Sequence, residues 1–268
     1  MNVDENLEYW NVKHHWPKDG EEWSSLWGGA EPQWFSAILP RIRHFVPTDT
    51  ILELGPGHGR WTNYLRNYCR QLFVVDLADN CIKFCQKRFA QDPHVLCYVN
   101  DGVSLAMIPD QSVDLVFSFD SLVHAEADVI KAYLDQLAKK LRPNGVGFIH
   151  HSNIGEYQKA CFLTTKVPVK VRKLLVRKGL LDRLPQGRAY SMTAELFEKY
   201  CDEAGLQCIV QELVNWQTSR PIDCLSLFTK KTSKWAGPSR VSRNTSFMKE
   251  ANLIRQLYNL YDFPLVLK

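Results

Sequence analysis

The sequence lacks several patterns that mark metal-stabilised, secreted or membrane-spanning proteins. Its eight cysteines form no C-x-x-C pair, which excludes zinc-ribbon and thioredoxin patterns. The N-terminal segment carries acidic residues and no apolar signal-peptide core, and no run approaches the roughly 18 apolar residues of a membrane span. Repeats of fixed period and low-complexity tracts are also missing. We therefore expect a reduced, soluble, cytoplasmic protein.

The composition that remains is that of an ordinary globular chain. Its 268 residues, 45% hydrophobic and 23% charged, fit one sizeable domain with additions. The formal net charge of +4 is mildly basic. Such a charge helps to attract an anionic substrate but does not by itself indicate nucleic acid, which is not an expected partner.

From Thr50 onward, short apolar runs alternate with helical stretches. Strands alternating with helices indicate parallel βαβ units covered on both faces. We therefore expect an α/β fold with a doubly wound, Rossmann-like sheet of seven strands, mostly parallel, the last strand being antiparallel. The expected strands are residues 51–54, 72–75, 95–99, 113–119, 146–149, 206–213 and 224–228. The expected core helices are residues 64–68, 79–89, 126–141 and 193–204, with Ser191 or Thr193 capping the last.

Four regions follow from this division of the chain. Residues 1–47 form a Trp-rich segment expected as a helical lid, and residues 48–153 and 189–231 form the core. Residues 154–188 form a basic helical insertion, and residues 232–268 a C-terminal helical appendage. The C-terminal helix places Phe247, Ala251, Ile254, Tyr258 and Tyr261 on one side, which would pack on its own domain or across a homodimer.

A glycine-rich turn separates the first expected strand from the next helix. Gly55-x-Gly57-x-Gly59 allows backbone to approach a ligand closely and directs helix N–H groups at it. The dinucleotide pattern G-x-G-x-x-G places its third glycine one residue later, and here that position is Arg60, followed by Trp61. The spacing therefore does not match that of NAD-binding proteins.

Glu53-x-Gly55-x-Gly57-x-Gly59 resembles the first motif of the class I S-adenosylmethionine methyltransferases, and further positions match in order up to about residue 230. The resemblance implies S-adenosyl-L-methionine as cofactor and S-adenosyl-L-homocysteine as product. It implies Asp76 for the two ribose hydroxyls, since a carboxylate accepts two hydrogen bonds from a diol. It also implies Leu77 and Asp101 beside the adenine, and Phe119 and Asp120 beside the methionine part. The implied cofactor-binding set is Glu53, Gly55, Pro56, Gly57, Gly59, Trp61, Asp76, Leu77, Asp101, Gly102, Val103, Phe119, Asp120, Trp23 and Trp27.

Each aspartate in that set also has a purely structural interpretation. Asp76 and Asp120 could cap the element that follows, and Asp101 could be a turn residue. The conjunction of these positions with the glycine turn favours a methyltransferase. A protein that binds S-adenosylmethionine without catalysis, or an NAD-type nucleotide binder, is the alternative from a different class.

Four histidines are placed where a catalytic base could lie, and His58 is the one inside the glycine turn. Methylation of an alcohol requires removal of a proton, whereas a neutral amine needs little more than positioning. His124 follows the fourth expected strand, and His150 and His151 close the fifth. Because side chains alternate along a strand, only one of that pair should face the pocket. We expect Asp120 with one of these histidines as the base, His150 or His151 first. A Mg²⁺ site built from Asp and His is the alternative, but without a second acidic pair no metal is expected.

The two flanking segments also have alternative interpretations. Trp23 and Trp27 are expected to contact the cofactor as part of the lid, the alternative being that they bury in the core. In the insertion, Lys166, Lys170, Lys173 and Arg177 follow helical spacing, as do Val167, Val171, Leu174 and Leu175. That helix is a solvated surface, a cap for an anionic acceptor, or a surface for peripheral contact with phospholipid headgroups.

The block His150-His151-Ser152-Asn153 and the Trp-rich start resemble those of bacterial methyltransferases that modify small molecules or saccharides. We therefore expect O-methylation of a polar small-molecule or saccharide acceptor. N-methylation of a small amine or natural-product intermediate is the main alternative. Phe119-Asp120-Ser121-Leu122 stands where many amide and base methylases carry an Asn/Asp-Pro-Pro-Tyr motif, which disfavours protein or RNA acceptors.

Overall fold

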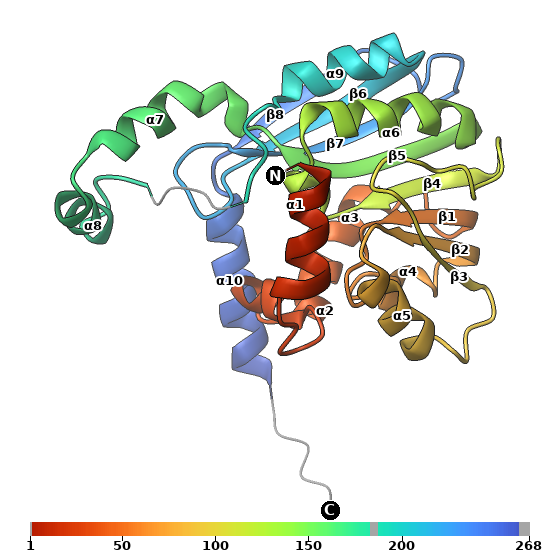
Figure 1. Ribbon diagram of the computed structural model, residues 1–268, viewed down its shortest axis with the longest axis horizontal. Helices are drawn as coiled ribbons and strands as arrows, with labels where there is room; N and C mark the ends of the chain where they lie inside the picture. Colours follow the sequence, from red (N-terminus) through yellow and green to blue (C-terminus); the bar gives the residue numbers. More distant parts are fainter. Residues whose placement is uncertain (1, 183–186, 263–268) are drawn as a thin grey trace, which may run out of the picture.

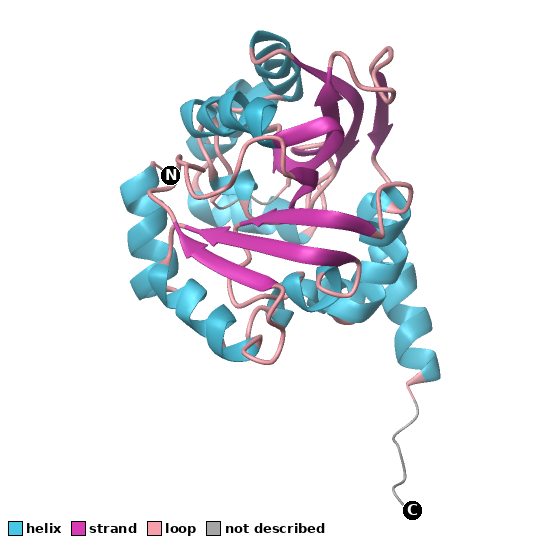
Figure 2. Ribbon diagram, turned by 90° about the vertical axis from the view of Figure 1, so that its right-hand side faces the viewer, coloured by secondary structure: helices cyan, strands magenta, loops and turns pink. Residues whose placement is uncertain are grey.

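One sheet runs through the part of the chain that the computed structural model describes, residues 2–182 and 187–262 (Figures 1 and 2). Its eight strands follow the order β3-β2-β1-β4-β5-β7-β6-β8. They are β1 (Thr48–Leu54), β2 (Cys69–Asp76), β3 (Val95–Val99), β4 (Val113–Ser118), β5 (Leu141–Ser152), β6 (Leu206–Val214), β7 (Asp223–Lys230) and β8 (Arg240–Asn244). The α/β, doubly wound class that the sequence predicts is confirmed. Residues 183–186 of the insertion and 263–268 of the appendage lie outside the described residues.

The prediction of seven strands was one strand short. β8 lies in the region expected to be helical and pairs in parallel with β6, where Val210 lies opposite Arg240. Its sequence, RVSRN, lacks alternating apolar residues because the strand is exposed along most of its length. The predicted antiparallel strand, β7, is confirmed, but it lies between β5 and β6 rather than at the edge.

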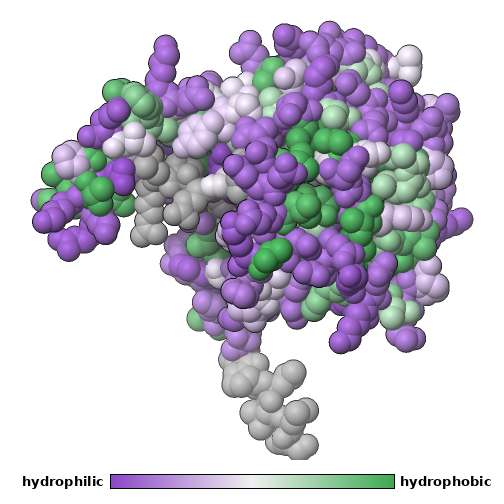
Figure 3. All heavy atoms as spheres, viewed as in Figure 1, coloured by the Kyte–Doolittle hydropathy of each residue, from purple (hydrophilic) through white to green (hydrophobic). Residues whose placement is uncertain are grey.

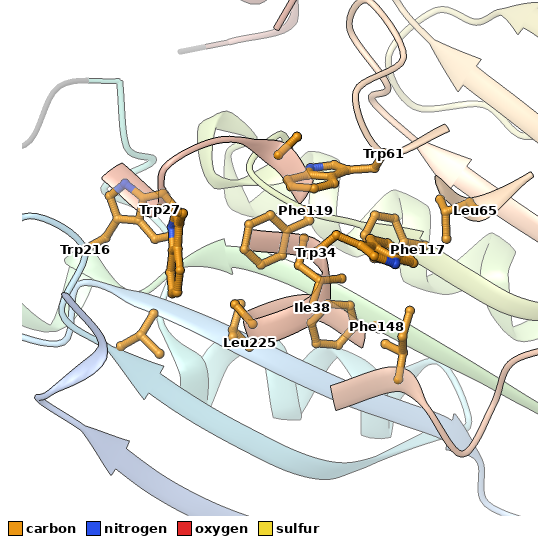
Figure 4. Close-up of a cluster of buried hydrophobic side chains, with 14 of the residues drawn as sticks. Trp27, Trp34, Ile38, Trp61, Leu65, Phe117, Phe119, Phe148, Trp216 and Leu225 are labelled. Atoms are coloured by element: carbon orange, nitrogen blue, oxygen red, sulfur yellow. The ribbon is translucent and has the colours of Figure 1, made fainter. Parts of the chain in front are cut away.

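Successive residues of a strand contribute to two separate hydrophobic layers, one on each face of the sheet. In β1, Ile51 contributes to one layer and Leu52 to the other. The first layer packs the sheet against the N-terminal helices, α4 and α10, and Figure 4 shows its Trp34, Trp61 and Phe117 side chains. The second layer packs the sheet against α6 and α9. The helices, including 3₁₀ and π turns labelled η, are α1 (Val3–Glu8), η1 (Tyr9–Lys13), η2 (Glu21–Trp27), α2 (Ala30–Gln33), η3 (Trp34–Ile38), α3 (Leu39–Ile42), α4 (Thr62–Leu65), α5 (Asp79–Arg88), η4 (Leu122–His124), α6 (Ala127–Lys140), η5 (Ile154–Tyr157), α7 (Gln158–Lys166), α8 (Val169–Arg177), α9 (Ala194–Glu203) and α10 (Phe247–Tyr261).

The C-terminal helix α10 packs on its own domain with only the first part of its apolar side. Phe247 and Ala251 are buried, whereas Tyr258 is 38% exposed and Tyr261 70% exposed. The helix extends beyond the sheet, as Figure 1 shows, and there Arg255 and Tyr258 lie against Gly28, with the Tyr258 hydroxyl donating to Glu31 at 3.3 Å. Among the described helices, none is long and apolar enough to cross a bilayer.

Thr193 begins α9 as one of the two predicted caps. Its hydroxyl oxygen accepts a hydrogen bond from the backbone N–H of Leu196 at 3.0 Å. The cap fixes where the helix enters, and α9 then buries Phe197 against the sheet.

Gly147 on β5 leaves the space that the ring of Phe228 on β7 occupies. A Cβ at this position would overlap that ring, which is fully buried and packed against Phe197. We expect Gly147→Ala to destabilise the fold by about 1–3 kcal/mol, as overpacked cores do. The midpoint of thermal unfolding should fall by roughly 2–4 °C per kcal/mol.

Gly237→Ala is the matched control, because a Cβ at Gly237 meets no atom within 4 Å. Equal melting temperatures for the two variants would contradict the close packing of β5 against β7.

Candidate active site

A large cavity lies where the strand order reverses. β1 has β2 on one side and β4 on the other, so the connections leave the carboxyl ends of β1 and β4 in opposite directions. A cavity of about 1330 Å³ opens there. Its wall combines the N-terminal segment, the glycine turn, the ends of β2 and β4, α8 and the residues around Trp216.

The glycine turn uses backbone conformations and space that other residues lack. Gly55, Gly57 and Gly59 have φ of 69°, 56° and 80°, in the left-handed region. A Cβ on Gly57 would lie 2.6 Å from the ring of Trp16, and one on Gly55 would overlap the hydroxyl of Ser121. Gly55, Pro56 and Gly57 line the cavity, whereas Gly59 faces Phe89. The turn therefore brings bare backbone to the cavity wall.

Asp76 closes β2 at the cavity. Its carboxylate accepts hydrogen bonds from the backbone N–H groups of Ala78 at 2.9 Å and of Gly57 at 3.2 Å. Burial raises the pKa of Asp76 to about 6, against the effect of these donors. Leu77 beside it also lines the cavity. Glu53 lies behind the turn instead: it is buried, accepts a hydrogen bond from the Thr62 hydroxyl at 2.6 Å, and burial raises its pKa to about 8.

Asp120 follows β4 and is joined to the glycine turn by Arg60. The guanidinium of Arg60 lies 3.1 Å from the Asp120 carboxylate, donates to the Ser24 hydroxyl at 3.0 Å, and stacks 4.5 Å from the ring of Trp61. Asp120 has φ of 62°, a conformation that costs a non-glycine residue about 1–3 kcal/mol. Arg60 thus connects the glycine turn to the end of β4 through an ion pair and to the N-terminal segment through a hydrogen bond.

His150 lies behind Asp120 and holds its backbone. The Asp120 N–H donates to Nδ1 of His150 at 3.2 Å, so this nitrogen carries no proton and Nε2–H donates to Asp223 at 3.2 Å. Arg188 binds the same carboxylate through Nε and Nη2. Although burial alone raises a carboxyl pKa, the charge of Arg188 and the bond from His150 lower the pKa of Asp223 to about 2. His150 is fully buried and does not line the cavity.

His151 points to the other face of β5, as alternation requires. Its ring stacks on Phe197 at 4.2 Å, Nδ1–H donates to the carbonyl of Ser152, and Nε2 accepts from the Ser226 hydroxyl at 2.8 Å. Burial lowers the pKa of His151 to about 4. With both nitrogens engaged away from the cavity, His151 is placed as a core residue.

His124 is the histidine that lines the cavity. Its Nδ1–H donates to the backbone carbonyl of Gly187, which leaves Nε2 with a lone pair and no partner among the described residues. Burial, with the charge of Arg188, lowers the pKa of His124 to about 4. The ring is therefore neutral at physiological pH, with one nitrogen free to accept a proton.

The N-terminal segment covers the cavity with three tryptophans, of which Trp23 is one of the two predicted. Trp10 and Trp16 line the cavity with Trp23, and Trp16 stacks on His58 at 4.5 Å. Trp27 is 1% exposed and packs against Phe247 at 5.1 Å, outside the cavity wall (Figure 4 shows it within the core). The alternative interpretation, a core tryptophan, fits Trp27.

Of the predicted cofactor-binding residues in the loop after β3, only Gly102 lines the cavity. Asp101 is exposed, and its carboxylate accepts from the N–H groups of Val103 and Ser104 within its own turn. Trp61, Phe119 and Asp120 line the cavity as expected.

Sequence reasoning missed Arg60, Arg188, Trp10, Trp16 and Trp216 as wall residues. Arg60, beside the glycine motif, carried a usable signal by its position. Trp10 lies in η1 and the others lie in loops, and the sequence pattern does not reveal the course of either. Within the described residues, no three His, Cys, Asp or Glu side chains cluster closely enough to hold a metal ion.

These residues fit S-adenosylmethionine. The bare glycine turn supplies the space that a Cβ would fill, and the buried Asp76 lies at its edge. The Trp61 indole N–H is buried with no acceptor among the described residues. Asp76 would hold the ribose, Leu77 and Gly102 the adenine side, and Phe119 and Asp120 the methionine side.

The carboxylate of Asp76 should make the affinity for the cofactor depend on pH. The ionised form accepts two hydrogen bonds, and protonation below its pKa of about 6 removes an acceptor. The affinity for S-adenosylhomocysteine should therefore fall several-fold as pH is lowered from 7.5 to 5.5, measured by isothermal titration calorimetry.

Asp76→Asn should bind about 10-fold or more weakly at pH 7.5 and lose this pH dependence. Asp135→Asn, on the exposed side of α6, is the control and should behave as wild type. An unchanged affinity for Asp76→Asn would contradict the assignment of Asp76 to the ribose.

Comparison with known proteins agrees with the fold and the motif. Residues 51–145 match the family model described as a methyltransferase domain. The chain is 37% identical over 68 residues to the ribosomal RNA small subunit methyltransferase A of Coxiella burnetii, which covers 25% of this chain and 24% of that protein. It is 28% identical over 118 residues to phosphoethanolamine N-methyltransferase 1 of Triticum aestivum, covering 42% and 24%. The chain thus spans about a quarter of the length of these curated relatives.

Solved structures show the same fold at low identity. The PH0226 protein of Pyrococcus horikoshii superposes with a TM-score of 0.57 at 17% identity, over 84% of this chain and 99% of that one. The DhpI–S-adenosylhomocysteine complex superposes with a TM-score of 0.53 at 18% identity, over 85% and 96%. Residues 51–145 therefore match a methyltransferase domain, the chain has the fold of these solved structures, and both findings support S-adenosylmethionine as its cofactor.

Proposed function

We propose that this protein transfers a methyl group to the oxygen of a polar small molecule, a saccharide or glycosyl compound first. The observation that carries the proposal is the placement of His124 and Asp120 on one cavity wall, beside the glycine turn and Asp76. When bound, S-adenosylmethionine supplies an electrophilic methyl group on a sulfonium. The chain's own residues then have to orient an acceptor and take its proton.

His124 suits the second task. Its Nε2 lone pair is free because Nδ1–H is bound to the Gly187 carbonyl, and its low pKa keeps it unprotonated at neutral pH. It would accept the hydroxyl proton as the oxygen gains its bond to carbon. Asp120, fixed by Arg60 and by the His150 Nδ1, would orient the hydroxyl as a hydrogen-bond acceptor. His150 would act through Asp120 as a positioning residue.

N-methylation of a small amine is the second candidate. Two curated relatives, from Triticum aestivum and Caenorhabditis elegans, are named phosphoethanolamine N-methyltransferases, at 28% identity each. An amine acceptor needs no base at the moment of transfer, so the dependence on His124 separates the two candidates. Other relatives are named ribosomal RNA methyltransferases, and an RNA acceptor would extend beyond a cavity of about 1330 Å³.

The test is a labelled-methyl transfer screen over free sugars, sugar phosphates, phenols and amines, followed by variants on any acceptor found. We expect His124→Gln to lower kcat by about 100-fold or more on a hydroxyl acceptor, while the affinity for S-adenosylhomocysteine is retained. His44→Gln, at an exposed position, should keep the full rate.

A full rate in His124→Gln would refute the base assignment. Turnover on amines alone would favour the N-methylation candidate. Cofactor binding without turnover on any acceptor would support the non-catalytic alternative.

A further inference from the structure

The insertion turns a charged helix face toward the cavity. Arg172, Lys173, Val176 and Arg177 of α8 line the cavity wall. Positions i, i+1, i+4 and i+5 share one side of a helix, so these residues form a single face. Figure 1 shows α7 and α8 reaching out from the body of the domain, with α8 at the tip.

Three apolar residues of α8, Val171, Leu174 and Leu175, lie on the other side. Val171 is 47% exposed and Leu174 is 43% exposed, and no residue of α8 is buried. Figure 3 shows hydrophobic and hydrophilic spheres together on the surface of this arm. An amphipathic helix that serves only to pack turns its apolar face inward. Here the inward face is the basic one, so packing against the core does not explain its orientation.

The cations of this face have no carboxylate partner in the part of the chain that the structure describes. Within the described residues, Arg172, Lys173 and Arg177 form no ion pair with any carboxylate, and the acidic residues of the cavity wall are Asp76 and Asp120. Asp120 is already paired with Arg60. Like charges on one helix face repel one another, and an anion bound in the cavity would offset that repulsion.

Arg188 extends the positive wall inward. Its Nε and Nη2 bind Asp223, while Nη1 has no acceptor among the described residues, and the residue lines the cavity. Its guanidinium lies 6.0 Å from the ring of Trp216, which lines the same wall. A planar donor fixed by a buried carboxylate suits a phosphate oxygen better than a mobile lysine does.

The cavity has room for a second ligand beside the cofactor. Single-ligand pockets have volumes of about 300–1,000 Å³, and this cavity measures about 1330 Å³. Asp76 and the glycine turn lie at the cofactor end, whereas α8 and Arg188 form the rest of the wall.

We propose that the acceptor carries a phosphate or diphosphate group, and that Arg172, Lys173, Arg177 and Arg188 bind it. Three unpaired cations and one free guanidinium nitrogen match a dianion better than a single carboxylate. This inference rests on the proposed function only in naming the phosphorylated ligand as the methyl acceptor. The anion site itself is a binding property of the chain and can be tested without catalysis. The phosphate would belong either to a soluble compound or to a lipid headgroup.

The experiment measures pyrophosphate binding by isothermal titration calorimetry, with and without saturating S-adenosylhomocysteine. The cavity-face variant combines Arg172→Gln, Lys173→Gln and Arg177→Gln. The control combines Lys159→Gln, Lys166→Gln and Lys178→Gln, which removes the same charge from exposed positions of the same insertion that do not line the cavity. Circular dichroism and thermal unfolding establish that both variants are folded.

We expect the cavity-face variant to bind pyrophosphate about 10-fold or more weakly than wild type, and the control to stay close to wild type. Equal affinities in all three proteins, or no binding by wild type, would overturn the proposal. Because pyrophosphate binding is also measured without the cofactor analogue, failure of S-adenosylhomocysteine to bind would count against the proposed function alone.

A vesicle assay assigns the source of the phosphate. Co-sedimentation with phosphatidic acid in phosphatidylcholine vesicles, lost in the cavity-face variant and kept in the control, would support a lipid headgroup. Pyrophosphate binding without any vesicle binding would support a soluble phosphorylated acceptor.

Discussion

The reversal of strand order at β1 is the constraint on which the site depends. β2 and β4 flank β1 in parallel, so the chain leaves their carboxyl ends toward opposite faces and opens a crevice between them. The glycine turn after β1, Asp76 after β2 and Asp120 after β4 all meet at this crevice because each follows a strand that ends there.

Holding Asp120 in place requires a second layer of buried polar groups. Its left-handed backbone is fixed by the His150 Nδ1, whose tautomer is set by Asp223, whose charge is in turn balanced by Arg188. A buried carboxylate between an arginine and a histidine is stable only as a complete set. The histidine that the sequence suggests as a base thus supports the site from behind, while His124 presents a free nitrogen to the cavity.

The sequence predicts the parts of this structure that depend on local signals. Apolar runs located β1 to β7, and the glycine spacing with Asp76 indicated the cofactor. The sequence did not predict β8, because Arg240–Asn244 is largely exposed and its apolar and polar residues do not alternate. Sequence alone could not separate His124 from His150, since the difference depends on the Gly187 carbonyl 63 residues away and on the Asp120 N–H. Nor could it separate Trp16, which covers Gly57, from Trp27, which packs on Phe247 of α10.

A crystal structure of the complex with S-adenosylhomocysteine tests the central claim most directly. The account predicts the ligand in the cavity, with both ribose hydroxyls within hydrogen-bond distance of the Asp76 carboxylate and the sulfur beside Phe119 and Asp120. The acceptor end, between His124, Arg188 and α8, should stay open to a second ligand. Ligand bound elsewhere, or a ribose that does not contact Asp76, would contradict it.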